Sequence, residues 1–125
     1  MEPNMSMEVA AVLFGIAAIG GLIMAGMRLS GTPQPPSWLA MVHGLLAAAG
    51  LTLLIYAAFT VGVPGMAQLA IAFFVVAAIG GAVLNLVFHW QKLALPIPLM
   101  IAHAVLAVIG FVLLLIAIFG QPHSG

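Results

Sequence analysis

The chain consists of four long apolar stretches joined by short polar connections. The apolar stretches cover residues 9–27, 38–60, 66–88 and 98–119. Each is long enough to cross a bilayer as a helix, which takes about 20 residues. Because the four stretches use most of the 125 residues, we predict an all-α membrane protein with a single four-helix transmembrane domain over residues 1–125.

The composition agrees with this architecture and excludes several classes of protein. Hydrophobic residues make up 66% of the chain and charged residues 3%, so the lipid bilayer is the expected environment. No basic patch is available for nucleic acid. The absence of cysteine excludes disulfides, thiolate-bound clusters, cysteine-based zinc sites and covalently attached haem. Glu2 and Glu8 stand where a cleaved signal peptide has basic residues, so we expect the first stretch to be retained.

The two basic residues predict an orientation. Arg28 and Lys92 follow the first and the third apolar stretch. By the positive-inside rule, the connections that contain them face the cytoplasm and both termini lie outside it. We therefore expect an integral protein of the bacterial inner membrane.

The second half of the chain repeats the first at a distance of 60 residues. Residues 9–60 align with residues 69–120 without a gap, and 17 of the 52 paired positions are identical. Each repeat contains two apolar stretches and forms a helical hairpin. The two hairpins therefore have parallel topology and are related by a pseudo-twofold axis along the membrane normal.

The identical positions recur in steps of four and three, which is the spacing of the inward face in a left-handed helical bundle. In the second and fourth stretches they are Leu39, His43, Leu46, Gly50, Leu53 and Ala57, paired with Leu99, His103, Leu106, Gly110, Leu113 and Ala117. In the first and third stretches they are Ala10, Phe14, Ala17 and Gly21, paired with Ala70, Phe74, Ala77 and Gly81. We expect this stripe to face the bundle interior.

Two residues of the stripe, His43 and His103, are ionisable. Such a side chain is costly inside a membrane and marks function by default. The pseudo-twofold axis places both imidazoles at one depth on opposite sides of the bundle centre, where they could supply the two axial ligands of one haem iron. His43 lies about 8 Å past Trp38 along its helix, so the site is nearer the cytoplasmic surface than the midplane.

Glycines occur at similar depth on all four predicted helices. They are Gly50 and Gly110 on the histidine helices, and Gly20, Gly21, Gly80 and Gly81 on the other two. Glycine allows close approach of a bulky group, here another helix or a flat macrocycle. Small residues on every helix favour the macrocycle.

Paired inward histidines with glycines around them resemble the four-helix haem core of membrane b-type cytochromes. That group includes respiratory cytochrome b and the cytochrome b subunits of membrane dehydrogenases and hydrogenases. The resemblance implies one b-type haem per chain, with His43 and His103 as iron ligands and the six glycines around it. Many of these cytochromes carry a further histidine on each ligand helix for a second haem. The corresponding positions here are Tyr56 and Ala57, and Ile116 and Ala117, so only one haem is implied.

Polar residues near the histidines have two interpretations each. Arg28, Lys92 and His89 lie on the same side of the membrane as the histidines. They either pair with haem propionates or anchor the helix ends at the surface. Asn85, whose repeat partner is Ala25, is expected to hydrogen-bond a neighbouring helix or to orient a ligand or propionate.

These patterns favour a single-haem electron carrier over a stand-alone enzyme. The chain has no acidic pair within the membrane, no phosphate-binding loop and no nucleophile beside a base. One haem in one half of the membrane is poorly placed to carry electrons across the bilayer, so we expect a redox partner or a larger membrane complex, with a quinone as a further candidate partner. Two alternatives stay open, namely a structural or accessory subunit whose histidines pack between helices, and a metal or small-solute transporter.

Overall fold

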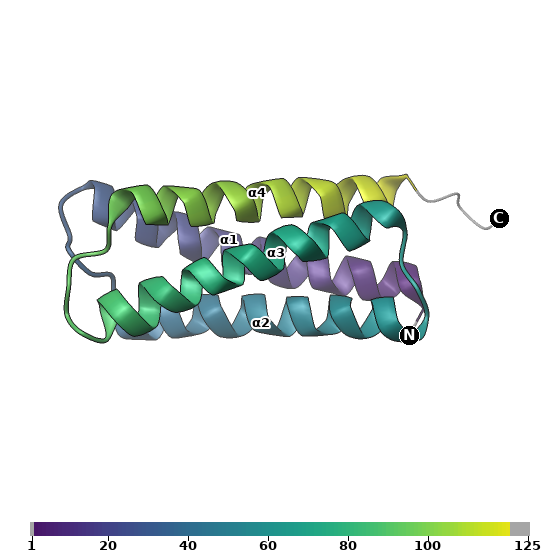
Figure 1. Cartoon of the computed structure of the whole chain (residues 1–125), viewed down its shortest axis with the longest axis horizontal. Coiled ribbons are helices and arrows are strands. Elements are labelled where there is room, and N and C mark those ends of the chain that lie inside the picture. Colours follow the sequence, from purple (N-terminus) through teal and green to yellow (C-terminus); the bar gives the residue numbers. More distant parts are fainter. Residues whose placement is uncertain (1, 121–125) are drawn as a thin grey trace.

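The structure, a computed structural model that describes residues 2–120, is a bundle of four long helices in up-down-up-down order (Figure 1). The helices are α1 (Pro3–Leu29), α2 (Ser37–Thr60), α3 (Gly65–Val83) and α4 (Ile97–Phe119), and α3 continues into a π-helical segment, η1 (Leu84–His89). All four are long and apolar enough to cross a membrane. The predicted all-α, four-helix transmembrane architecture is confirmed.

Prolines mark the start of every helix. Pro36, Pro64 and Pro96 directly precede α2, α3 and α4, and Pro3 opens α1. Proline lacks the amide hydrogen and has a fixed φ, so it is well tolerated where helical N–H groups have no partner within the helix. α1 begins at Pro3 rather than at residue 9, because the more polar segment ahead of the apolar stretch continues the same helix.

The bundle is built from two hairpins. α1 packs most extensively against α2, and α3 against α4, while the hairpins meet along the thinner α1–α4 and α2–α3 interfaces. α1 and α3 therefore lie on one diagonal of the bundle, and α2 and α4 on the other. The connections 30–36 and 90–96 lie together at one end, termed the loop end (Figure 1). The connection 61–64 and the start of α1 lie at the opposite end, termed the terminus end.

The hydrophobic core is interrupted at the level of the histidines. One cluster of buried side chains, nearer the terminus end, consists of Met7, Ala10, Phe14, Leu54, Ala67, Ala70, Phe74, Leu114 and Ala117. A second cluster, at the loop end, consists of Leu84, Leu95 and Met100. His43 and His103 lie between the two clusters and belong to neither.

Side-chain burial repeats with the sequence. The buried positions of α1 and α3 include Ala10, Phe14 and Ala17 with their partners Ala70, Phe74 and Ala77, and those of α2 and α4 include Gly50, Leu54 and Ala57 with Gly110, Leu114 and Ala117. The predicted stripe of α2 and α4 is buried only in part. Leu54 and Leu114 are fully buried while Leu53 and Leu113 are half-buried, and His43 and His103 are half-buried as well. An α-helix has 3.6 residues per turn, so its inward face drifts away from a strict 3.5-residue repeat.

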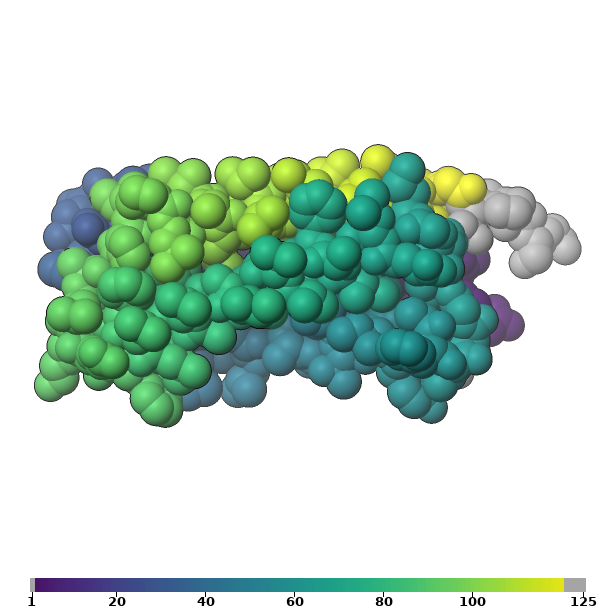
Figure 2. All heavy atoms as spheres, viewed as in Figure 1, coloured from purple at the N-terminus to yellow at the C-terminus, as the bar shows by residue number. Residues whose placement is uncertain are grey.

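Large apolar side chains cover the outside of the bundle. Ile19, Ile79 and Val108 are each more than half exposed, and they are three of many. Figure 2 shows one such face, on which α3 runs between α4 and α2. Exposed apolar surface on this scale marks contact with a membrane or with other proteins, and the length of the helices indicates a lipid bilayer.

Candidate functional site

His43 and His103 face each other across the bundle centre. They belong to α2 and α4, and their ring centroids lie 6.1 Å apart with an angle of 74° between the ring planes. Two imidazole nitrogens on opposite sides of one metal ion, each about 2 Å from it, put the ring centres about 6 Å apart. The observed separation is close to this value, and it is also within the range of an edge-to-face pair of aromatic rings.

Each imidazole is oriented by a hydrogen bond to the neighbouring helix of its own hairpin. His43 Nδ1 donates to the Ala17 carbonyl at 2.7 Å, and His103 Nδ1 donates to the Ala77 carbonyl at 2.6 Å. Because a carbonyl oxygen only accepts, Nδ1 carries the hydrogen, and the lone pair of a neutral ring lies on Nε2. Metal-binding histidines are commonly held in this way through their second nitrogen. Within residues 2–120, neither Nε2 has a hydrogen bond.

Glycines on α1 and α3 make room for the two rings. A Cβ atom on Gly21 would lie 2.9 Å from His43 Cε1, and a Cβ atom on Gly81 would lie 3.0 Å from His103 Cε1. The contact of Gly21 is shorter than real Cβ atoms show, and that of Gly81 is tighter than nine in ten of them, so in both hairpins the ring would have to shift. In the structure, the bulky group that Gly21 and Gly81 admit is therefore the imidazole itself.

The level of the bundle that contains the two imidazoles, termed the histidine layer, is lined on α1 and α3 by small residues. These are Ala17, Gly20 and Gly21 on α1, and Ala77, Gly80 and Gly81 on α3. All four helices therefore contribute to the layer, two with an imidazole and two with alanine and glycine. The predicted glycines of α1 and α3 lie at the site that the histidines form.

The next layer toward the terminus end contains a stacked aromatic pair. The rings of Phe14 and Phe74 lie 3.9 Å apart between centroids and are nearly parallel, at 5°. A Cβ atom on Gly50 or on Gly110 would lie 3.2 Å from one of these rings. Gly50 and Gly110 thus face a phenylalanine in the structure, and their predicted contact with haem stays a prediction. The repetition of phenylalanine on the inward stripe is the sequence signal for this pair.

The loop end is held by hydrogen bonds from side chains of one hairpin to the backbone of the other. The donors and acceptors are Arg28 Nε with the Leu95 carbonyl (2.8 Å), Gln34 Nε2 with the Leu93 carbonyl (2.8 Å), and His89 Nε2 with the Pro35 carbonyl (2.8 Å). Arg28 at the end of α1 and His89 at the end of η1, two of the predicted propionate partners, therefore each bind the connection of the other hairpin. The third, Lys92, is exposed and has a φ of 57° where the helix ends.

The site offers two protein ligands. Among residues 2–120, no group of three or more His, Cys, Asp or Glu side chains is close enough to hold one metal ion. Structural and catalytic zinc sites use three or four protein ligands. A pair of imidazoles suits a metal whose remaining ligands come from an organic ring, as in haem.

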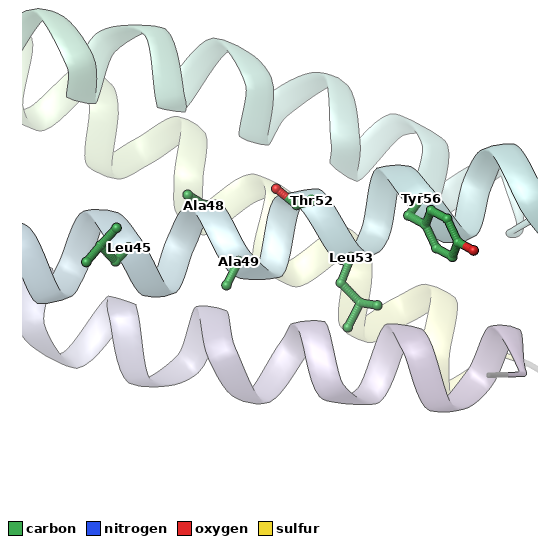
Figure 3. A pocket seen from close by; sticks show the side chains of 6 residues that line it. All are labelled: Leu45, Ala48, Ala49, Thr52, Leu53 and Tyr56. Atoms are coloured by element: carbon green, nitrogen blue, oxygen red, sulfur yellow. The ribbon is translucent and has the colours of Figure 1, made fainter.

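A shallow groove lies on α2, outside the histidine layer. It has a volume of about 610 Å³ and is lined by Leu45, Ala48, Ala49, Thr52, Leu53 and Tyr56 (Figure 3). The paired positions on α4 are Val105, Val108, Ile109, Val112, Leu113 and Ile116. Small residues of α2 are thus replaced by branched aliphatic ones at the paired positions of α4.

Comparison of the chain with protein-family models, with curated proteins and with solved structures gave no match. A proposal for its function therefore rests on the geometry of this chain.

Proposed function

We propose that the chain is a membrane electron-transfer protein that binds one b-type haem through His43 and His103. The observation that carries this proposal is the 6.1 Å separation of the two ring centroids, with each Nδ1 donating to a backbone carbonyl. This arrangement leaves Nε2 of both rings available, so His43 and His103 are the residues that would hold the iron of one haem.

The residues around the histidines fit such a group. The donor set is two neutral imidazoles, as haem iron requires in a bis-histidine cytochrome. Alanine and glycine on α1 and α3 line the same layer, and the interface between the hairpins is thin. When bound, haem supplies reversible one-electron oxidation and reduction of its iron. The chain would hold the iron from two sides and surround it with apolar helices.

A single haem implies a partner. The positions for a second pair of ligands hold Tyr56, Ala57, Ile116 and Ala117. The one pair of histidines lies on the loop side of the stacked phenylalanines. Electrons would therefore enter and leave near the loop end, by exchange with a redox protein, a larger membrane complex or a quinone.

The loop end is assigned to the cytoplasmic side of a bacterial inner membrane, with both termini outside. Arg28 and Lys92 both lie at that end. By the positive-inside rule, basic residues favour the cytoplasmic side, and this supports the assignment. Because the sequence contains no cysteine, a single Gln91→Cys or Val61→Cys substitution gives a unique label site at either end. In intact cells, we expect an impermeant maleimide to label Val61→Cys and not Gln91→Cys. The reverse pattern would overturn the orientation.

A structural role for the histidines is the second candidate. The Nδ1 hydrogen bonds to Ala17 and Ala77 join the two helices of each hairpin, as a polar side chain does in many membrane bundles. Under this alternative the protein is a small accessory subunit without a cofactor.

A visible spectrum of protein purified from haem-sufficient cells separates the two candidates. We expect about one haem per chain, and a sharp α-band of low-spin b-type haem after reduction. The 74° angle between the ring planes further predicts a strongly anisotropic low-spin signal in electron paramagnetic resonance, because perpendicular rings leave two iron d orbitals nearly equal in energy. Folded protein with no Soret band, even after addition of haemin, would support the structural role.

A further inference from the structure

Asn85 is a polar side chain within a helix long and apolar enough to cross a membrane. It lies in η1 and is half-buried. Its carboxamide takes part in no side-chain hydrogen bond of residues 2–120, and its polar atoms stay accessible at the surface of the bundle. An amide within a membrane span is costly when it stays unsatisfied, because hydrocarbon offers no hydrogen bonds. Asn85 lies toward the loop end of its span, Gly65–His89. Residues 2–120 do not supply the expected bond to a neighbouring helix, so the carboxamide is free to bind another group at that end.

The backbone around Asn85 also departs from the repeat. The Trp90 N–H donates to the Asn85 carbonyl at 2.9 Å, an i→i+5 bond. The equivalent segment of α1, residues 24–29, is regular α-helix and carries Ala25 at the paired position. A π-helical turn accommodates one extra residue and is frequent at functional sites. A residue with positive φ follows α1 and η1 in the two hairpins. In the first it is Gly31, and in the second it is Lys92, which pairs with Thr32 and therefore lies one position later in the repeat.

The position of Asn85 relates it to the histidine layer. Gly81 contacts the His103 ring, and Asn85 follows four residues later, on the same helical face and about 6 Å nearer the loop end. Arg28 lies farther along in the same direction, seven residues and about 10 Å beyond Gly21. Asn85 thus lies between the imidazoles and the basic loop end. If a haem were bound between the imidazoles, a propionate on the edge of its macrocycle would extend into this region.

The hydrogen-bonding groups of the carboxamide indicate what kind of group Asn85 would bind. It does not orient His103, because Nδ1 of that ring already donates to the Ala77 carbonyl. A carboxamide N–H is a good donor to a carboxylate, and the two propionates are the only acidic substituents of b-type haem. We propose that Asn85 is a positioning residue that donates a hydrogen bond to a haem propionate and makes the two halves of the site inequivalent. This inference rests on the proposed function.

The test compares Asn85→Ala with the parent protein, each loaded with haem and with haem dimethyl ester. A hydrogen bond to the propionate disperses its negative charge, so its removal should stabilise ferric iron and lower the midpoint potential. We expect Asn85→Ala to keep low-spin haem, to lower the potential and to shift the propionate carboxylate bands in the redox infrared difference spectrum. With the uncharged ester, the change in potential should be lost. Leu86→Ala is the matched control, since this neighbour in η1 is 51% exposed and should change neither readout.

The outcomes separate the two proposals. A parent protein that binds no haem would overturn both. A parent protein with low-spin haem, and an Asn85→Ala variant with unchanged potential and carboxylate bands, would overturn the role of Asn85 alone. The same holds if the potential shifts equally with haem and with its ester, because that result points to a structural effect of the substitution.

Discussion

The two hairpins are nearly identical where they face each other and differ where they face the loop end or the lipid. At the histidine layer, the Nδ1 hydrogen bonds measure 2.7 and 2.6 Å. The hypothetical Cβ contacts of Gly21 and Gly81 measure 2.9 and 3.0 Å. Outside this layer, residues 84–89 form a π-helical segment where the paired residues of α1 are regular α-helix, and the groove on α2 is lined by small residues that α4 replaces with branched ones.

The difference indicates which contacts depend on both hairpins at once. A residue on the pseudo-twofold axis meets its own repeat partner, as in the His43–His103 and Phe14–Phe74 pairs. A substitution in one hairpin would therefore change a contact that the other hairpin also makes. A residue on the lipid face or in a connection meets no such partner, so the two copies can diverge there without disturbing the centre.

The largest expected effect is the loss of either histidine. His43→Ala and His103→Ala should each abolish the low-spin haem spectrum and weaken haem binding by about tenfold or more, because each removes one of two axial ligands. The measurement is the reduced visible spectrum together with haem titration. His89→Ala is the control, since its ring bonds to Pro35 at the loop end, and it should leave the spectrum unchanged. Loss of haem from His89→Ala alone would show that the ligands are assigned wrongly.

A smaller effect is expected from the glycines that hold the rings. Gly21→Ala and Gly81→Ala each place a methyl group at 2.9 to 3.0 Å from an imidazole carbon, so the ring must move. We expect each substitution to destabilise the protein by about 1–3 kcal/mol and to speed haem loss to a similar extent in the two hairpins. Gly26→Ala is the matched control on α1, because a Cβ there has no neighbour within 4 Å. Equal behaviour of all three variants would argue against tight packing at the histidines.

The smallest expected effect lies in the loop end. Gln34→Ala removes the hydrogen bond to the Leu93 carbonyl and should lower the free energy of unfolding by about 1 kcal/mol. The spectrum and potential of the haem should not change, because the connections lie outside the histidine layer. Denaturation of detergent-solubilised protein measures the stability, with the exposed Gln91→Ala as control. A spectral change in Gln34→Ala would mean that the loop end and the histidine layer are coupled.

The four helices were predictable because their signal is local. An apolar stretch of about 20 residues specifies a membrane span whatever surrounds it, and the proline at each start specifies the boundary. The pairing of His43 with His103 was predictable for a different reason. A repeat of 60 residues implies a symmetry axis, and a residue on the inward stripe then has its own copy as its nearest candidate partner.

Several features of the site had no signal in the sequence. The contact of Gly50 with Phe14 and of Gly110 with Phe74 depends on how far each helix slides along its neighbour. The π-helical turn of residues 84–89 aligns without a gap on residues 24–29, which are regular α-helix in α1. The bond from Arg28 to Leu95 depends on how the end of α1 meets the connection of the other hairpin.

The sequence by itself determined that this protein is a four-helix membrane bundle built from two copies of a hairpin, with a histidine of each copy on the inward stripe. It could do so because periodicity, hydropathy and internal repetition are properties of the chain alone. Only the tertiary structure decided that the rings lie 6.1 Å apart and that each donates to a carbonyl. It also decided that Asn85 has no partner in the described chain. Those distances come from the packing of residues far apart in sequence, which periodicity and hydropathy do not specify.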